Sequence, residues 1–247
     1  MTHGVITLPA FARRKDGVRH FFGTRHRPAG PAGDAVSVTQ GPLVDRAAGE
    51  PVAVVSVKQV HGTAALVLDR PVKVGERIAG GWDALITNRP HVLLTVRTAD
   101  CVPVLVHDPA SKVVAAVHAG WRGATDGILP KTLSILRRRF GADPRRMQIG
   151  IGPAVGPCCY EVDEPVLERL RAGFPDWQAV VRHVGGRKAM LDLQDLLWRQ
   201  AESAGVPEDR IRTVRVCTVC HPTLFYSYRR EGTVLGTMVS GIMRVGR

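Results

Sequence analysis

Apolar residues run along the chain in short, nearly continuous stretches, each ended by a polar or turn-forming residue. Runs of this length and composition are typical of strands in a well-covered sheet. The pattern predicts strands at PVAVVSV (51–57), TAALVLD (63–69), DALITN (83–88), HVLLTVRT (91–98), VPVLVHD (102–108) and KVVAAVHA (112–119). Later runs predict a strand at IRTVRVC (211–217) and a possible hairpin of LFYSYRR (224–230) with VLGTMVSGIM (234–243).

Helical periodicity is legible in three segments only. These lie near Thr125–Phe140, Pro165–Phe174 and Leu191–Ala204. Because strands outnumber helices and do not strictly alternate with them, the pattern predicts an α+β fold, a sandwich of mixed β-sheets. We expect a single domain over residues 1–247, with an N-terminal segment at 1–20 and a Gly-, Pro- and Ala-rich surface loop at 27–49.

Length and composition narrow the class of protein. A chain of 247 residues with 45% hydrophobic content can bury one full core. We find no apolar segment suited to export or to crossing a bilayer, so we expect a soluble, cytoplasmic protein with no membrane partner. The five cysteines are an odd number, which favours free or metal-bound thiols over a disulfide framework.

The net charge of +12 raises the question of nucleic acid as a partner. Arg137–Arg139 fall at the end of a predicted helix, and Arg145 and Arg146 follow in the next loop, so these five are expected to form a solvated face. Aromatic residues make up only 5% of the chain, too few for base-stacking platforms. The positions of the arginines and the low aromatic content therefore favour an anionic small molecule, or no charged partner, over nucleic acid.

Candidate chemistry gathers at the ends of the predicted strands. Cys101 lies in a polar break between two strands, His118 ends the following strand, and His61 follows the strand that begins at Pro51. Taken singly, each is more often a packed or surface residue than a ligand. Together they form a His, Cys, His set suited to zinc with its fourth position left to water or substrate.

Two further patterns carry weaker signals. CTVCH (217–221) matches a haem attachment string, but covalent haem attachment belongs to exported proteins, so we expect no haem. Cys217 and Cys220 are expected to pack as small hydrophobic residues, since the adjacent Cys158 and Cys159 lack zinc-ribbon spacing. GIGPAVG (150–156) departs from the dinucleotide-binding glycine spacing and predicts a turn, so no nucleotide cofactor is expected.

Several longer motifs resemble those of the laccase-domain or YfiH-like family, often labelled polyphenol oxidase. They are FGTR (22–25), KQVHG (58–62), DALIT (83–87), TADCVPVL (98–105), HAGWRG (118–123), IGPAVGPCCYEV (151–162), LDL (191–193), CT (217–218) and YSYRREG (226–232). They occur in the family's order and at about its spacing from Phe22 to Met243. The resemblance also implies that helices flank the mixed sheets.

The resemblance implies a function as well as a fold. His61, Cys101 and His118 would be zinc ligands, with copper possible in vitro. The activity would be purine nucleoside phosphorylase, acting on purine nucleosides and inorganic phosphate, with adenosine deamination and methylthioadenosine phosphorolysis reported for the family. A three-ligand zinc lowers the pKa of bound water to about 7, which suits attack on a purine. A monomer is favoured, and the oligomeric state stays open.

Phosphorolysis also needs groups that hold phosphate near the metal. Arginines and lysines do so and offset the charge of the transition state. Our candidates are four cations within the matched motifs: Arg25, Lys58, Arg122 and Arg229. Asp100, next to the thiol, is expected to transfer a proton or to orient a histidine, and the sequence does not decide between the two roles.

Two departures and two rival functions accompany the resemblance. HRPAGPAGDAVSVTQ (26–40) replaces the family's usual pieces after Arg25, and Thr237 stands where an arginine commonly follows the last glycine. The same residues would permit a thiol hydrolase with Cys101 as nucleophile and His118 as base. A role in editing peptidoglycan precursors is the other rival. A true multicopper laccase is set aside because no His-x-His pair occurs among the nine histidines.

Overall fold

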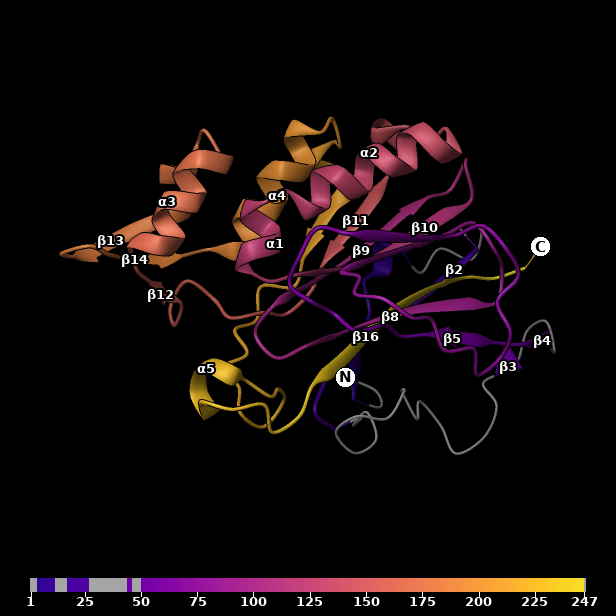
Figure 1. Cartoon of the computed structure of the whole chain (residues 1–247), viewed down its shortest axis with the longest axis horizontal. Coiled ribbons are helices and arrows are strands. Elements are labelled where there is room, and N and C mark those ends of the chain that lie inside the picture. Colours follow the sequence, from indigo (N-terminus) through magenta and orange to yellow (C-terminus); the bar gives the residue numbers. More distant parts are fainter. Residues whose placement is uncertain (1–3, 12–16, 27–43, 46–49, 247) are drawn as a thin grey trace.

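The computed structural model describes residues 4–11, 17–26, 44–45 and 50–246 (Figure 1). The expected surface loop at 27–49 therefore lies outside the described residues except for 44–45, as does all but His26 of the segment at 26–40 that departs from the family. Within these ranges no helix combines the length and the apolar character needed to cross a membrane.

A six-stranded sheet forms the middle layer of the fold. Its order is β15-β11-β9-β10-β7-β6, with β6 parallel to β7, β11 parallel to β15, and the other neighbours antiparallel. Its strands are β6 (Ala65–Leu68), β7 (Ala84–Thr87), β9 (Val102–Asp108), β10 (Val113–Ala119), β11 (Gln148–Ile151) and β15 (Ile211–Thr213). Every residue of β9 and β10 is buried. Cover on both faces explains why these strands read as continuous apolar runs rather than as alternating ones.

A five-stranded sheet covers one face of the middle layer. Its order is β1-β2-β16-β8-β5, and its strands are β1 (Val5–Ile6), β2 (Val18–Gly23), β16 (Met238–Arg244), β8 (Val92–Thr98) and β5 (Ala53–Val55). Leu94 of β8 and Ile242 of β16 share a core cluster with Leu105 of β9 and Ala116 of β10. The two sheets therefore form a sandwich, joined by the side chains that β9 and β10 direct away from the helices.

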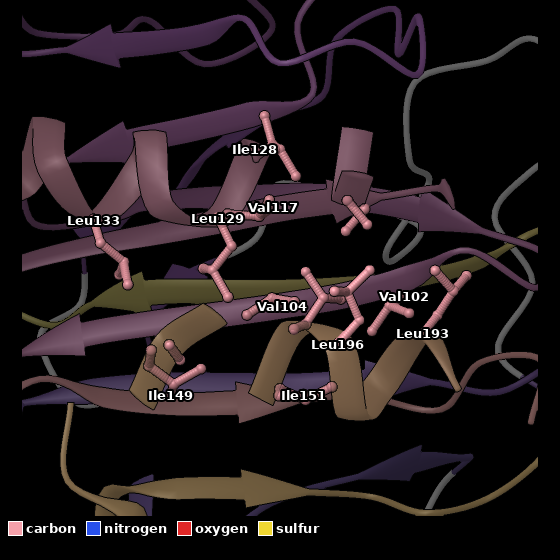
Figure 2. Packing of buried hydrophobic residues seen from close by; sticks show 14 of the residues in the cluster. Val102, Val104, Val117, Ile128, Leu129, Leu133, Ile149, Ile151, Leu193 and Leu196 are labelled. Atoms are coloured by element: carbon pink, nitrogen blue, oxygen red, sulfur yellow. The ribbon is translucent and has the colours of Figure 1, made fainter. Parts of the chain in front are cut away.

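Helices cover the other face. α2 (Ile128–Phe140) and α4 (Leu193–Ser203) lie along the six-stranded sheet, and the short α1 (Trp121–Thr125) follows β10 (Figure 1). Figure 2 shows Leu129 and Leu133 of α2 and Leu196 of α4 directed onto Val104, Val117 and Ile149. Burial of these branched side chains holds the helical layer on the sheet, at about 25 cal/mol per Å² of apolar surface removed from water.

A small sheet with one helix extends the helical side of the molecule, and the other short elements lie away from the helical layer (Figure 1). A three-stranded sheet, ordered β12-β14-β13, lies beside α3 (Glu164–Gly173), and β3 (Val44–Asp45) pairs with β4 (Glu50–Pro51). The three strands are β12 (Glu161–Val162), β14 (Lys188–Leu191) and β13 (Val181–Gly185). α5 (Tyr228–Glu231) is a single turn near the C-terminal end.

The sequence-based expectations hold for the architecture and fail at one hairpin. The α+β sandwich of mixed sheets flanked by helices is confirmed, and each strand predicted between 51 and 119 contains an observed strand. Residues 224–230 do not form the first strand of a hairpin, because the Ser227 hydroxyl accepts the Arg230 N–H and starts α5. β16 instead pairs with β2 and β8. The helix predicted from Thr125 begins at Ile128, after Gly127 takes a left-handed conformation at φ 79°.

Candidate metal centre and cleft

His61, Cys101 and His118 meet at one end of the six-stranded sheet, where β9 begins and β10 ends. Because β9 and β10 are antiparallel neighbours, with Val102 opposite Ala119, the start of β9 lies beside the end of β10. This register brings Cys101 and His118 together. The ligand atoms of His61, Cys101 and His118 all lie within 4.8 Å of one another, and the two imidazole rings meet edge to face. The structure thus gathers the predicted ligand set into a site that could hold a metal ion.

Asp83 organises both histidines. Its Oδ1 accepts the His118 Nδ1–H at 2.8 Å and the His61 backbone N–H at 3.0 Å, and its Oδ2 accepts the Gly62 backbone N–H at 2.8 Å. The carboxylate therefore holds a proton on His118 Nδ1 and leaves Nε2 as the atom that could bind a metal. Sequence analysis did not select Asp83, although it opens the DALIT motif directly before a buried strand.

Gly120 makes room for the side chains of His61 and Cys101. A Cβ at this position would lie 2.9 Å from His61 Cδ2 and 3.1 Å from Cys101 Sγ, closer than side-chain packing allows. Its φ of −72° suits any residue, so the requirement for glycine is steric rather than conformational. The HAGWRG motif therefore places a glycine where His61 and Cys101 approach the end of β10.

We expect Gly120→Ala to fold normally but to bind metal at this site roughly tenfold or more weakly, because the added methyl displaces His61 or Cys101. Metal content and the melting temperature of the variant check this together. An unchanged metal affinity, or a loss of metal explained by general unfolding, would contradict it.

The charge state of the three groups reflects their mutual contacts. Burial disfavours the charged form of His118, but its hydrogen bonds with Asp83 and Cys101 prevail and raise its pKa to about 9. Burial likewise opposes the Cys101 thiolate, yet hydrogen bonds from His118 and His61 lower the pKa of Cys101 to about 7. Two imidazoles turned toward one sulfur stabilise a thiolate, the form of cysteine that binds metals.

His61, Cys101 and His118 line an open cleft of about 1810 Å³. Lys58 and Arg122 also line it, and neither forms an ion pair with a carboxylate of the described residues. The Arg122 guanidinium stacks 4.4 Å from the centre of the Trp121 ring. Two cations without a carboxylate partner give the cleft a positive field suited to an anion.

Aromatic side chains that sequence analysis did not select complete the cleft. Tyr160, Tyr226 and Tyr228 line it. Burial, followed by the nearby Cys101 sulfur, raises the pKa of the Tyr160 phenol well above its usual value, so the hydroxyl stays neutral. Tyr160 and Tyr226 occur within motifs that had been matched, and their chemistry near the metal ligands was visible only in three dimensions.

Asp100, another predicted site residue, is held by hydrogen bonds to protein groups. Both carboxylate oxygens of Asp100 are hydrogen bonded, one to the Thr218 hydroxyl at 2.5 Å and the other to the Arg229 backbone N–H at 2.6 Å. Asp83, rather than Asp100, contacts the histidine. Asp100, at φ 91°, thus ties the Cys101 turn to α5.

The two remaining predicted cations differ in position. Arg229 lines the cleft, donates to the Glu161 carbonyl and stacks 5.3 Å from the centre of the Tyr160 ring. Arg25 is not brought to the cleft wall. Its guanidinium donates to the Pro222 carbonyl and lies 4.7 Å from the centre of the Tyr226 ring, behind a residue that does line the cleft. Thr237 also lines the cleft.

The expectation for Cys217 and Cys220 is wrong. They do not pack as isolated small hydrophobic residues, since Cys220 is exposed and the sulfurs of both lie within 4.8 Å of those of Cys158 and Cys159. Their spacing along the chain suggested that Cys158 and Cys159 could not supply a second pair of ligands. The loop between β11 and β12 nevertheless places them next to Cys217 and Cys220.

Comparisons with known proteins agree on the kind of protein. A family model described as multi-copper polyphenol oxidoreductase laccase matches residues 29–245. Purine nucleoside phosphorylase YlmD of Geobacillus stearothermophilus is 37% identical over 165 residues, which cover 66% of this chain and 60% of that protein. Adenosine deaminase RL5, from an unknown prokaryotic organism, is 36% identical over 193 residues, covering 76% and 73%. The crystal structure of YlmD from Geobacillus stearothermophilus matches with a TM-score of 0.82 and 29% identity, covering 100% of this chain and 98% of that chain.

Proposed function

Because the chain belongs to the family described as multi-copper polyphenol oxidoreductase laccase, in which similar proteins are named purine nucleoside phosphorylases, we propose that it is a zinc-dependent enzyme of that activity. Its substrates would be adenosine, inosine, guanosine and methylthioadenosine, each with inorganic phosphate. Adenosine deamination would be a side activity, as the relative named adenosine deaminase suggests.

The observation that carries the proposal is the meeting of two imidazoles and one thiol in a cleft that Lys58 and Arg122 also line, two cations that pair with no carboxylate of the described residues. His61, Cys101 and His118 fit Zn²⁺, which takes nitrogen and sulfur ligands and keeps an open position at catalytic sites. Bound there, Zn²⁺ would supply a Lewis acid that polarises an oxygen of water or substrate. Asp83 would hold His118 in the ligating tautomer.

The chain's own residues account for the remaining steps. Lys58 and Arg122 would bind phosphate and direct one of its oxygens to C1′ of the ribose. A bond forms between C1′ and a phosphate oxygen as the bond from C1′ to the purine nitrogen breaks, and the proton that the phosphate loses ends on that nitrogen, so the products are the free base and ribose 1-phosphate. Positive charge that develops on the ribose in this step is offset by the bound phosphate. The neutral Tyr160 hydroxyl is placed to donate a hydrogen bond to the nucleoside, and Arg229 holds the Tyr160 ring.

One alternative is favoured by a specific observation. The contacts run from Asp83 to His118 to Cys101, the order of partners found in cysteine hydrolases. His61, however, has no task in such a triad, yet its imidazole faces the same sulfur. A copper cluster of the laccase type would need several histidines. Among the described residues, His61 and His118 are the only histidines in the groups that could hold a metal ion.

The direct test is incubation of the purified protein with adenosine or inosine, with and without phosphate, and identification of the products by mass. We expect free base and ribose 1-phosphate only when phosphate is present, and some inosine from adenosine without it. Failure to release base under any condition would refute the phosphorylase and leave the hydrolase or a role in peptidoglycan-precursor editing.

A matched pair of arginines locates the phosphate contact. Arg122 and Arg169 both lie over the Trp121 ring, but only Arg122 lines the cleft, while Arg169 pairs with Asp126. Arg122→Ala is expected to raise the KM for phosphate roughly 10- to 100-fold and to spare deamination without phosphate. Arg169→Ala should leave both unchanged. Equal effects of the two substitutions would place the phosphate elsewhere.

A further inference from the structure

Four cysteines converge at a point separate from the candidate catalytic ligands. Cys158 and Cys159 lie between β11 and β12, and Cys217 and Cys220 lie after β15. All four are free thiols, and their sulfurs lie within 4.8 Å of one another. The Cys220 sulfur is 3.6 Å from that of Cys158 and 3.4 Å from that of Cys159. The cluster shares no residue with the His61, Cys101 and His118 set.

The spacing of the sulfurs suits one small cation. With Zn–S bonds of about 2.3 Å, the sulfurs of a tetrahedral site stand about 3.8 Å apart. The separations of the Cys220 sulfur from those of Cys158 and Cys159, 3.6 and 3.4 Å, are close to this value, and the whole group lies within 4.8 Å. In addition, the sulfurs converge as a group of four rather than as two isolated pairs, as a single central ion requires.

The backbone around Cys217 is arranged for a thiolate. The Gly156 N–H donates to the Cys217 sulfur at 3.2 Å, and backbone N–H groups of Val219 and Cys220 also point to this sulfur. Several N–H groups turned onto one sulfur form an anion-binding nest, which favours the charged ligand form of cysteine. A sulfur in a disulfide is neutral and would make little use of these donors.

Close backbone pairing keeps the two loops together. Ala154 forms an isolated parallel bridge with Cys217, and the Thr218 N–H donates to the Ala154 carbonyl at 2.9 Å. At Gly156 a Cβ would lie 3.1 Å from the Cys217 Cβ and 3.3 Å from the Cys158 sulfur, so glycine permits the approach. The thiols of Cys158 and Cys220 are exposed, which leaves a path for an ion to enter.

We propose that Cys158, Cys159, Cys217 and Cys220 form a second metal site, a structural tetrathiolate Zn²⁺ centre that clamps the loop before β12 to the loop before α5. Four thiolates and no open position are the mark of a structural rather than a catalytic zinc site. Tetrahedral sulfur coordination also suits iron, and metal analysis of the purified protein distinguishes iron from zinc.

The clamp would brace the wall of the cleft. Tyr160 follows Cys159 directly and lines the cleft, while Thr218 follows Cys217 and donates to Asp100 beside Cys101. The site would therefore act on the cleft through the backbone of these two loops, without touching substrate. It does not depend on the proposed phosphorylase activity.

Metal analysis of matched variants tests the proposal. The wild type should carry two zinc ions per chain after purification without chelator. Cys158→Ser/Cys220→Ser should lose one ion and retain the other, and His61→Ala/His118→Ala should show the reverse loss. His221→Ala is the control, because His221 completes the CTVCH string but bonds the Cys217 carbonyl through Nδ1, and it should retain both ions. The cysteine variant should also melt roughly 10 °C lower.

A second measurement covers a cysteine variant that fails to fold. Apo protein of the His61→Ala/His118→Ala variant is titrated with Co²⁺, which should give the intense visible bands of tetrahedral thiolate coordination at one equivalent. Full wild-type zinc in Cys158→Ser/Cys220→Ser, absence of those cobalt bands, iron in place of zinc, or disulfides among the four cysteines in freshly purified protein would each overturn the proposal.

Discussion

Cys101→Ala is expected to lose one metal ion and the phosphorolytic activity together, with the rate falling on the order of 10³-fold. Cys101 is the residue on which both the metal enzyme and the cysteine hydrolase depend, since its sulfur faces His61 and His118. In the metal enzyme it is only a donor. Cys101→Asp should therefore retain some metal and some activity, because a carboxylate oxygen is also a zinc ligand.

The cysteine hydrolase predicts a different result for the same substitutions. A nucleophilic sulfur has no oxygen substitute, and a covalent adduct would build up during turnover. Metal content, phosphorolysis and intact mass are measured for Cys101→Ala, Cys101→Asp and the wild type. An adduct mapped to Cys101, or full activity without metal at His61 and His118, would establish the hydrolase instead. The four-cysteine cluster gives an internal standard, since its metal should be unaffected.

Asp83→Asn is expected to weaken metal binding at His61, Cys101 and His118 about 10- to 100-fold and to reduce activity by a similar factor. The carboxylate accepts the His118 Nδ1–H and three backbone N–H groups, of Val60, His61 and Gly62, which shape the His61 turn. An amide of the same size has one oxygen, so it cannot accept all of these hydrogen bonds. The metal dissociation constant is measured by competition with a chelator.

Asp108→Asn is the matched control for Asp83→Asn. Asp108 is also fully buried, ends β9, and accepts the Ala110 and Asp143 backbone N–H groups at 3.0 and 3.1 Å. Both substitutions should lower the melting temperature, because both leave buried N–H groups without a partner. Only Asp83→Asn should change the metal affinity. Equal losses of metal in the two variants would show a general effect of instability.

Much of the fold could be predicted from local sequence. β9 and β10 are apolar at most positions; β9 ends at the polar Asp108, and β10 ends at Ala119, directly before Gly120, so their bounds followed closely from composition. The segment 224–230 could not be predicted in this way. Its aromatic, alternating pattern suits a strand, but the Ser227 cap and the bond from the Arg229 N–H to Asp100 make a helical turn more stable there. Asp100 lies 129 positions away in the chain, beyond any local pattern.

The residues of the candidate site also divide into those that the sequence could predict and those whose role depends on long-range contacts. His61, Cys101 and His118 could be selected because each has chemistry at the end of a predicted strand and lies in a specific motif. Asp100 shared those properties and Arg25 lies in a matched motif, but the Arg25 guanidinium does not line the cleft, and both Asp100 oxygens have structural partners. Membership of a matched motif did not distinguish a side chain that faces the cleft from one that supports the wall of the cleft.

By itself the sequence determined the strand-rich α+β class, the family resemblance and the three donor residues, because strand propensity, burial and donor chemistry are properties of residues and their near neighbours. Tertiary structure decided which donors meet. The antiparallel register of β9 and β10 joins Cys101 to His118, and Asp83 adds His61. The loop after β11 brings Cys158 and Cys159 to Cys217 and Cys220. These contacts join segments far apart in the chain, and only the packing of whole sheets sets the distances between them.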